Sequence, residues 1–335
     1  MAKPLGEFDF IDRFIKAQAA LGQPMYRRGD ALGIGDDCAL MPPLEAGEQL
    51  AVATDMLVEG RHYFSDVDPK ALGHKVLAVN LSDLAAMGAR PLAFTLAAAL
   101  RGLDPTWLEA FLSGMLALAR DAQCALIGGD TTGMPANGAQ VFCVTVMGTV
   151  PIGQALRRDG LCDGDDLWVS GSLGDAAFAV QLRRDDPKLL WPSPRIALGL
   201  RLRSLAHAAI DISDGLQAEI MHLLRASGGV AAQLDWDSIP LGPRVQQAVR
   251  EGVLSATQAT VIAVTGGDEY ELLFSAPPEC RTEIRDLAMQ QGVALTRIGE
   301  VRSAAAPSIH WHHHDGRGVD AGVVEAIGHG GFTHF

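Results

Sequence analysis

Six short acidic motifs punctuate this sequence, and most of them directly follow a run of apolar residues. They are Gly35-Asp36-Asp37, Thr54-Asp55, Ser82-Asp83, Gly129-Asp130, Asp211-Ile212-Ser213-Asp214 and Gly267-Asp268-Glu269. Apolar runs of this kind are typical of buried strands, so we expect most of these carboxylates where a strand ends. A neighbouring glycine lets the backbone turn tightly and lets a ligand approach it. Any single acid of this set could equally be a turn residue or a helix N-cap.

Six such motifs in one chain indicate bound cations. Two unpaired carboxylates about 4 Å apart repel each other by roughly 4 kcal/mol at an effective dielectric constant near 20. A divalent cation is the simplest way to remove that repulsion. The available donors are oxygens, because the sequence has no Cys-x-x-Cys and no His-Glu-x-x-His motif. We therefore expect a hard ion, magnesium, with manganese as a substitute.

Magnesium held by carboxylates mostly serves phosphate chemistry, yet the familiar nucleotide motifs are missing. No Gly-Lys pair occurs, so there is no P-loop of the Walker type. The catalytic-loop and Asp-Phe-Gly signatures of protein kinases are absent as well. A nucleotide enzyme of this kind must neutralise phosphate charge with several metals and isolated basic residues. Arg158, in the segment 154–160, is one candidate, although on its own it resembles an ordinary exposed arginine.

Charge and composition exclude several classes of protein. Lys and Arg total 27 against 40 Asp and Glu, which gives a formal net charge of −13. Nucleic acid is therefore a poor candidate partner, because phosphate backbones are held by surplus basic side chains. The five cysteines are widely spaced and mostly lie in apolar runs, as expected for reduced thiols of a cytoplasmic protein. The apolar run 91–100 is much shorter than the ~20 residues of a membrane helix, and we expect neither a membrane span nor a signal peptide.

The helices and strands that must position the acids suggest an α+β (α/β) protein. A chain of 335 residues can form two domains of roughly 150 residues each. We place the boundary near residue 151, between an N-terminal domain of residues 1–150 and a C-terminal domain of residues 151–335. In the first domain, helices are expected from Phe10, over 72–88 and from Pro105, and strands at 38–41, 50–57, after Pro91, 124–128 and 140–150. In the second, strands are expected at 167–170, 230–236, 261–264 and 270–275, and helices near 175–182, over 194–209 and from Asp214.

Three further features need a structural interpretation. Each half has a Gly-Gly-Asp triplet after a predicted strand, at 128–130 and 266–268, but two triplets do not establish an internal repeat. The segment 163–166 (Asp-Gly-Asp-Asp) lacks the spacing of a calcium-binding EF-hand loop, so we expect a surface turn. The histidine-rich tract 310–314 could bind a transition metal. We favour a solvated hairpin, because Asp315-Gly316 follows it as a turn.

Five segments together resemble the bacterial thiamine-monophosphate kinase family. They are residues 33–40 (GIGDDCAL), 53–55 (ATD), 75–88 (KVLAVNLSDLAAMG), 126–132 (LIGGDTT) and 210–216 (IDISDGL). Their order and spacing fit over essentially the whole chain. That family belongs to a superfamily of ATP-binding synthetases, which includes aminoimidazole ribonucleotide synthetase, selenophosphate synthetase and a hydrogenase-maturation protein.

The resemblance implies a fold and an activity. The N-terminal mixed-sheet domain would pair with its twin in a homodimer, and ATP and magnesium would lie in a cleft between it and the C-terminal α+β domain. The enzyme would phosphorylate thiamine monophosphate to thiamine diphosphate with ATP. No side chain is expected to act as a general base, because the acceptor phosphate monoester is already mostly a dianion at neutral pH.

The resemblance also implies roles for individual residues, carried over motif by motif. Magnesium would be held by Asp37, Thr54, Asp55, Asp83, Asp130, Asp211 and Asp214. ATP would contact Gly129, Asp130, Arg158 and Ser213. Thiamine monophosphate would contact His62, Asp268 and Phe332.

Some positions depart from the family pattern. Other enzymes of the superfamily have sequence features that can be checked in this chain. Relatives usually read Gly-Gly-Glu-Asp where this chain has the acids exchanged, as Asp268-Glu269, and they often have a hydroxyl residue at Ala53. Selenophosphate synthetases carry a reactive cysteine before the first Gly-Asp-Asp motif, whereas Cys38 lies after it. The hydrogenase-maturation relative ends in cysteine, and this chain ends in Phe335. Another synthetase of the superfamily, or a non-catalytic metal- or nucleotide-binding protein of the same fold, is the alternative.

Overall fold

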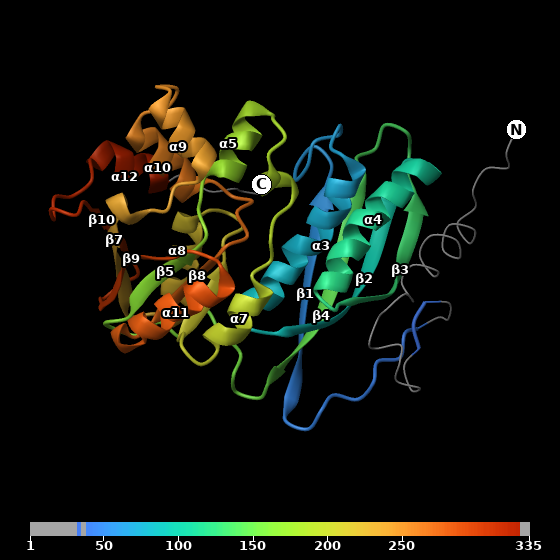
Figure 1. Ribbon diagram of the computed structural model, residues 1–335, viewed down its shortest axis with the longest axis horizontal. Helices are drawn as coiled ribbons and strands as arrows, with labels where there is room; N and C mark the ends of the chain where they lie inside the picture. Colours follow the sequence, from blue (N-terminus) through green and yellow to red (C-terminus); the bar gives the residue numbers. More distant parts are fainter. Residues whose placement is uncertain (1–31, 35–37, 329–335) are drawn as a thin grey trace, which may run out of the picture. The chain divides into compact units, whose positions relative to one another are not determined.

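The computed structural model describes residues 32–34 and 38–328, and the chain divides into two compact units (Figure 1). Unit 1 comprises Met1–Leu84 and Ala89–Gly153, and unit 2 comprises Ala85–Gly88 and Gln154–Phe335. Each unit has a sheet of its own. None of the described helices is both long and apolar enough to cross a membrane.

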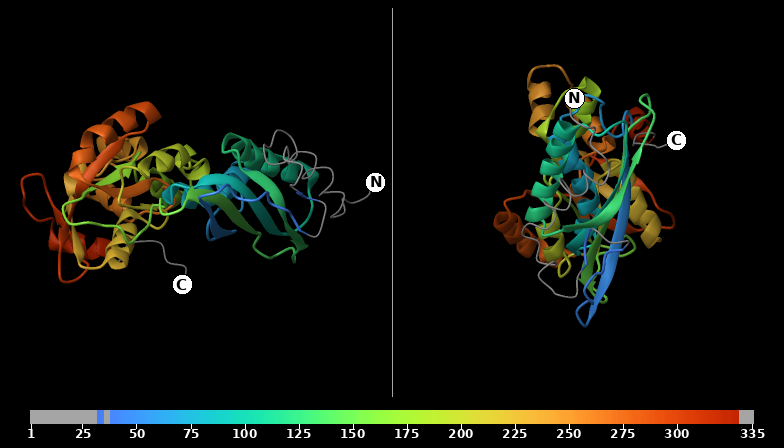
Figure 2. Two further views of the ribbon diagram at one scale, coloured as in Figure 1. Left: turned by 90° about the horizontal axis from the view of Figure 1, so that it is seen from below. Right: turned by 90° about the vertical axis from the view of Figure 1, so that its right-hand side faces the viewer.

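Unit 1 is a four-stranded mixed sheet with strand order β1-β4-β2-β3. Its elements are β1 (Glu48–Val58), α3 (Pro69–Ala86), β2 (Arg90–Leu100), α4 (Pro105–Asp121), β3 (Ala125–Gly133) and β4 (Val141–Pro151). Strand β4 pairs antiparallel with both β1 and β2, whereas β2 and β3 are parallel and are joined through α4. Both helices cover the same face of the sheet, and among the described residues no helix covers the other face (Figures 1 and 2).

Helix α4 forms as its sequence predicts. The Asp104 side chain caps the helix by accepting a hydrogen bond from the Thr106 amide at 3.0 Å, and Pro105 occupies the first turn. Four apolar residues at helical spacing are buried in it, namely Leu108, Phe111, Leu112 and Met115. The Phe111 ring stacks on Phe142 of β4 with 4.6 Å between ring centroids, which attaches the helix to the sheet.

The two helices of unit 1 touch through a reciprocal pair of glycines. A Cβ atom on Gly73 of α3 would lie 1.9 Å from the carbonyl oxygen of Phe111 in α4. A Cβ atom on Gly114 of α4 would lie 1.9 Å from the carbonyl oxygen of Lys70 in α3. No other residue type fits such a close approach of two backbones.

Unit 2 is a six-stranded sheet with strand order β10-β7-β9-β5-β8-β6, in which β10 and β7 are parallel and the other pairs are antiparallel. Its strands are β5 (Asp166–Ser170), β6 (Ala208–Asp211), β7 (Val230–Asp235), β8 (Leu272–Ala276), β9 (Leu295–Ser303) and β10 (Ile309–His312). Its helices are α5 (Asp175–Leu182), α6 (Pro187–Leu190), α7 (Ile196–Leu202), α8 (Leu216–Ser227), α9 (Pro243–Arg250), α10 (Ala256–Thr265), α11 (Arg281–Gln291) and α12 (Ala321–Gly328), with the 3-10 turns η3 (Trp236–Ser238) and η4 (Pro278–Cys280).

The sheet of unit 2 is buried on both faces. Successive residues of β5 belong to different clusters, since Leu167 and Val169 pack in one hydrophobic core and Trp168 packs in another. All five residues of β5 and all five of β8 are buried. Alternation of side chains along a strand explains this division, because neighbours point to opposite faces.

Four expectations about local structure are wrong. The predicted strand at 261–264 is part of α10, whose start is fixed by a capping box between Ser255 and Gln258. A short apolar run cannot be distinguished from a buried helical segment by its pattern alone. The predicted helix over 194–209 ends at Leu202, and its last two residues begin β6. Residues 38–41 form an isolated bridge rather than a strand.

The fourth correction concerns the acidic segment 163–166. Its first half is a surface turn, but Asp165 and Asp166 are 2% and 1% exposed and lead into β5. The Asp166 carboxylate is held by the guanidinium groups of Arg281 and Arg297. The predicted helix from Phe10 lies outside the described residues.

Candidate active site

Asp55 and Asp83 are two predicted magnesium ligands of unit 1. Asn80 connects the strand that contains Asp55 to the helix that contains Asp83. Asp55 lies inside β1, and its amide donates a hydrogen bond to Asn80 Oδ1 of α3 at 2.9 Å. The fully buried Asn80 amide also donates to the Val76 carbonyl at 3.0 Å. Asp83 follows Asn80 by three residues, so both lie on the same side of the helix. Asn80 was not predicted as a site residue, although it stands two residues before the acidic motif Ser82-Asp83.

The side chains of Thr54 and Asp55 do not lie together. Neighbouring residues of a strand point to opposite faces of the sheet, so only one of the two can face the helices. The Thr54 hydroxyl is exposed and forms a hydrogen bond of 2.9 Å with the Thr145 hydroxyl on β4. The expectation of an acidic motif after a strand is wrong here, because both residues lie within β1.

Gly129 and Asp130 also lie within a strand, β3, and not in a turn after it. Asp130 is exposed and lies opposite Ala97 of β2. Strand β3 is three strand spacings from β1, which is roughly 14 Å, so unit 1 does not place Asp130 beside Asp55. Gly129 has φ of 151°, and a Cβ atom there would lie 1.8 Å from the Leu96 carbonyl oxygen.

His62 is held at the end of β1. Its Nδ1 atom accepts a hydrogen bond from the Val58 amide at 2.9 Å, and its own amide donates to the Val58 carbonyl at 2.9 Å. Because Nδ1 is an acceptor, the proton of the neutral ring is on Nε2. His62 therefore offers Nε2–H as a hydrogen-bond donor to a ligand.

Unit 2 brings two acids of the predicted site together with a third that was not predicted. Asp211 ends β6, Asp214 follows in the turn, and the buried Glu219 lies in the first turn of α8. The Glu219 Oε1 atom accepts hydrogen bonds from the Ser213 hydroxyl at 3.3 Å and from the Asp214 amide at 3.2 Å. Burial first, and then the carboxylates of Asp211 and Asp214, raise the pKa of Glu219 to about 7 against the opposing hydrogen bond from the Asp214 amide. Negative charge is therefore concentrated at this turn.

Arg158 belongs to the same neighbourhood. Its side chain is exposed, and its positive charge opposes the rise in the pKa of Glu219. Its carbonyl accepts a hydrogen bond from the Ser227 hydroxyl at 3.2 Å, which ties the loop to the end of α8. Glu219 was missed at the level of sequence, although an acid in the first helical turn after the Asp-Ile-Ser-Asp-Gly motif could have indicated it.

Asp268 and Glu269, the two exchanged acids, have different environments. Asp268 is partly exposed, has φ of 64°, and accepts a hydrogen bond from the Tyr270 hydroxyl at 3.1 Å. Glu269 is 1% exposed, and its Oε1 atom accepts a hydrogen bond from the Gly174 amide at 2.7 Å. Burial raises the pKa of Glu269 to about 8, although Lys188 is nearby. Asp268 is therefore the acid that a ligand can reach.

The donors fit a hard divalent cation in kind, since those within the described residues are carboxylates and one threonine hydroxyl. Burial is the largest cause of the raised pKa of Glu219, and the carboxylates of Asp211 and Asp214 add to it, whereas Arg158 opposes it. Within the described residues, two groups of at least three ligand side chains have donor atoms within 4.8 Å of one another, and they consist of Cys162, Asp165 and His207, and of Asp235, Asp237 and His314. Neither group contains a predicted magnesium ligand. Asp37 and Phe332 lie outside the described residues.

The histidine tract forms a strand and a turn, as expected for a hairpin. Residues 310–312 pair with β7, and the His313 amide donates to the Arg317 carbonyl at 2.8 Å across the turn. The tract is not merely solvated, because His313 Nδ1 lies 3.0 Å from Asp237 Oδ1.

Comparisons with known proteins identify the family of this chain. Residues 35–150 match the family model of the AIR synthase related protein, N-terminal domain. The thiamine-monophosphate kinase of Salmonella typhimurium is 39% identical over 309 residues, covering 88% of this chain and 90% of that protein. The enzyme of that name from Haemophilus influenzae is 34% identical over 343 residues, covering 99% and 98% of the two chains.

Solved structures give the same result. The crystal structure of thiamine-monophosphate kinase from Stenotrophomonas maltophilia is 42% identical, with a TM-score of 0.80 over 95% of this chain and 99% of that one. A relative solved in complex with AMPPCP and TMP is 26% identical, with a TM-score of 0.72 over 99% and 97%. The hydrogenase maturation protein HypE, at 18% identity and a TM-score of 0.73 over 92% of each chain, shares the fold alone. The chain therefore belongs to the thiamine-monophosphate kinase family, within the AIR synthase-related superfamily.

Proposed function

We propose that this chain transfers the γ-phosphoryl group of ATP directly and in line to the phosphate of thiamine monophosphate, with magnesium, forming thiamine diphosphate and ADP. Membership of the thiamine-monophosphate kinase family supports the kinase activity. The acid-rich turn at Asp211 and Asp214, with Arg158 beside it, is the single observation that carries the phosphate chemistry. The activity of another synthetase of the superfamily is not supported in this way, because HypE, at 18% identity, shares only the fold.

The acids are proposed to hold magnesium. Asp37, Thr54, Asp55, Asp83 and Asp130 would contribute from the N-terminal domain, and Asp211 and Asp214 from the C-terminal domain. Magnesium, when bound, supplies charge neutralisation at the phosphate oxygens and orients them. Glu219 positions this set by accepting hydrogen bonds from the Ser213 hydroxyl and the Asp214 amide.

The remaining site residues are proposed to bind and orient the two substrates. Gly129, Asp130, Arg158 and Ser213 would contact ATP. Gly129 has no side chain, so a ligand can approach its backbone. Arg158 would place positive charge beside the transferred group. No general base is needed, because the acceptor phosphate is mostly a dianion at neutral pH.

Thiamine monophosphate is proposed to contact His62, Asp268 and Phe332. The Nε2–H group of His62 is a suitable donor to a phosphate oxygen. Asp268 offers an accessible carboxylate to the cationic thiazolium ring, and the aromatic face of Phe332 would attract the same cation by about 0.5–2 kcal/mol.

Two copies of the chain are proposed to pair through their N-terminal domains of residues 1–150, with ATP in the cleft to the C-terminal domain of residues 151–335. The face of the unit 1 sheet that none of the described helices covers supports this pairing. Along β1, Leu50, Val52 and Met56 alternate onto one face and are 47%, 57% and 55% exposed. An apolar row of this kind is typical of a surface that another protein covers. The proposed location is the cytoplasm, in keeping with five free cysteines.

The test is an assay of ADP release and thiamine diphosphate formation from ATP, thiamine monophosphate and magnesium. Asp55→Asn should lower turnover at least about 100-fold at unchanged melting temperature, because a neutral amide cannot hold the cation. Removing magnesium with a chelator should abolish turnover. Near-normal turnover of Asp55→Asn at saturating magnesium would rule out its role as a ligand. Labelled phosphate on the protein after incubation with γ-labelled ATP alone would rule out direct transfer.

A further inference from the structure

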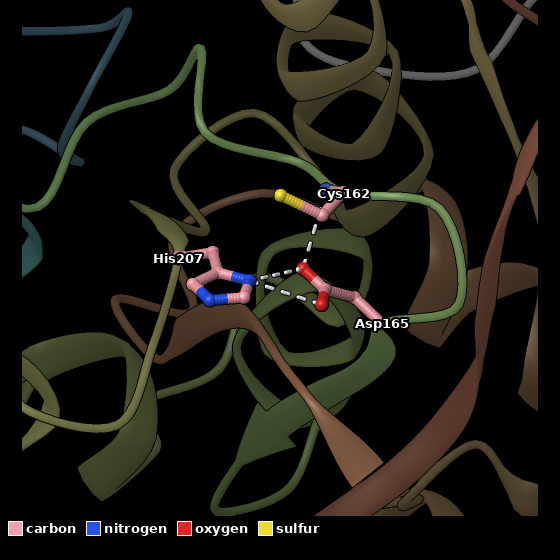
Figure 3. Close-up of side chains that lie close together, drawn as sticks. All are labelled: Cys162, Asp165 and His207. Carbon is pink, nitrogen blue, oxygen red and sulfur yellow. Dashed lines mark hydrogen bonds and ion pairs between the residues drawn. The ribbon is translucent and has the colours of Figure 1, made fainter.

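Cys162, Asp165 and His207 form a mixed cluster of sulfur, oxygen and nitrogen donors in unit 2 (Figure 3). Asp165 immediately precedes β5, and His207 immediately precedes β6. Asp211 is at the other end of β6, four residues and roughly 13 Å from His207. The cluster is therefore separate from the acids assigned to the kinase reaction.

The donor atoms are already close to the spacing that a small metal ion requires. All three lie within 4.8 Å of one another, and His207 Nδ1 lies 3.0 Å from both carboxylate oxygens of Asp165. Two nitrogen or oxygen ligands at about 2.0–2.1 Å from a tetrahedral zinc ion are roughly 3.3 Å apart. An ion could thus replace the proton between imidazole and carboxylate with little movement.

The carboxylate is fixed by neighbouring groups. The Asp165 side chain is 3% exposed, and its Oδ2 atom accepts hydrogen bonds from the Ser275 hydroxyl at 2.9 Å and the Cys162 amide at 3.2 Å. Ser275 lies on β8, between β5 and β6, and its carbonyl accepts from the His207 amide at 2.9 Å. Hydrogen bonds of this kind orient metal ligands in known sites. Cys162 and His207 are exposed, so an ion can reach the cluster from solvent.

We propose that Cys162, Asp165 and His207 bind a transition-metal ion of the zinc class, with solvent completing the coordination. Thiolate and imidazole ligands favour zinc and disfavour magnesium, which prefers oxygen. On binding, the metal takes the place of the Cys162 thiol proton, which passes to solvent. The bound ion would link the loop after Arg158 to the start of β6.

A cysteine nucleophile activated by His207 is the other chemistry that these residue types suggest. In that arrangement the thiol would be paired with the imidazole. Here the thiol donates instead to the Gly160 carbonyl at 3.5 Å, and His207 Nδ1 faces the carboxylate. The cluster therefore fits a metal better than a nucleophile.

The experiment uses the full chain, stripped with a chelator and titrated with Co²⁺ in excess magnesium. Thiolate coordination should give a charge-transfer band in the near ultraviolet, which oxygen-only sites cannot produce. Cys162→Ser should abolish the band. His207→Ala should weaken Zn²⁺ binding at least tenfold by calorimetry. Cys38→Ser, which removes another exposed thiol, is the matched control and should leave both signals unchanged.

Kinase activity with magnesium reports folding in every variant, because neither Cys162 nor His207 is assigned to the reaction. Zinc should also raise the melting temperature of the wild-type chain, but not that of Cys162→Ser. Absence of the band in the wild-type chain, or the same band in Cys162→Ser, would overturn the proposal. Loss of Zn²⁺ binding in His314→Ala, with none in His207→Ala, would instead assign the metal to the group of Asp235 and Asp237.

Discussion

The triplet Gly-Gly-Asp occurs twice in this chain, and its two copies have different structures. Residues 128–130 lie inside β3, an outermost strand of its sheet, which pairs in parallel with β2. Residues 266–268 follow helix α10, in a segment without regular structure. The expectation that each triplet follows a strand is wrong in both places, because the first triplet lies within β3 and the second follows a helix. The flanking sequence, and not the triplet itself, decides the local fold.

The glycines nevertheless have the same physical role in both places. A Cβ atom on Gly129 would lie 1.8 Å from the Leu96 carbonyl oxygen, and one on Gly267 would lie 2.4 Å from the Ser213 carbonyl oxygen. Each glycine permits one backbone to approach another, and the aspartate that follows is then placed near that contact. The comparison shows that a shared motif can preserve a close approach without preserving a secondary structure.

The largest effect is expected when β3 can no longer lie close to β2 at Gly129. Gly129→Ala should lower the free energy of unfolding by about 3–5 kcal/mol, because β3 would have to move away from β2 and φ at this position suits glycine. Gly267→Ala should cost less, about 1–3 kcal/mol, because its loop can shift more easily than a paired strand. Chemical denaturation of both variants checks the order, and a larger loss for Gly267→Ala would reverse the comparison.

The aspartate of the first triplet is expected to act on turnover. Asp130→Asn should lower kcat about 100-fold, since it removes a charge proposed to hold magnesium beside ATP. The melting temperature should stay within a degree or two, because the side chain is exposed. Steady-state kinetics with varied magnesium measure the effect. Asp104→Asn is a control for a carboxylate that only caps a helix, and it should leave kcat unchanged.

Glu269, next to the second triplet, should control the pH dependence of stability. Its pKa is about 8 in the folded chain against an ordinary value of 4.5, so between these values the folded chain holds one more proton than the unfolded chain. The free energy of unfolding must therefore fall as pH rises from about 4.5 to 8. Glu269→Gln removes this pH dependence. The free energy of unfolding of the variant, measured relative to wild type, should therefore rise by about 2–4 kcal/mol as the pH is raised from 5 to 8.

Denaturation of wild type and Glu269→Gln at several pH values provides the measurement. The exposed Glu279 supplies the control, because Glu279→Gln should run parallel to wild type. A constant difference between Glu269→Gln and wild type across the range would mean that Glu269 is ionised in the folded chain.

The smallest effect is expected at Asp268, the aspartate of the second triplet. Asp268→Ala should raise KM for thiamine monophosphate about tenfold, equivalent to about 1.4 kcal/mol, and leave KM for ATP unchanged. Glu269→Ala, by comparison, should act on stability rather than on KM, because its side chain is buried. The opposite ranking of the two KM values would show that the substrate contact has moved by one residue along the motif.

Much of the fold could be predicted from sequence, and the errors have identifiable causes. Helix α4 was predictable because its cap and its apolar spacing agree. The segment 261–264 was not, since four apolar residues suit a strand and a buried helix equally. The acids of the candidate site were recognisable by motif. Alternation along a strand predicts that Thr54 and Asp55 point to opposite faces of the sheet. Which of the two faces the helices could not be predicted, because it depends on the packing of α3 against β1.

Residues that act through a tertiary contact were the hardest to predict. Asn80 is an ordinary helical residue until α3 is placed against β1, where its amide meets the Asp55 backbone. Glu219 gains its raised pKa only when the turn of Asp214 folds over it. The buried Asp165 was read as a surface residue because its four-residue segment is polar.

The reciprocal glycine contact between α3 and α4 limits how the site can move. Sliding α3 by one residue, about 1.5 Å, would bring a side chain against the Phe111 carbonyl, and sliding α4 would do the same at Lys70. Neither helix can translate along the other, so any rearrangement during turnover has to carry both as one rigid body. The axial position of Asp83 is thus set by a contact at Gly73, ten residues and roughly 15 Å away.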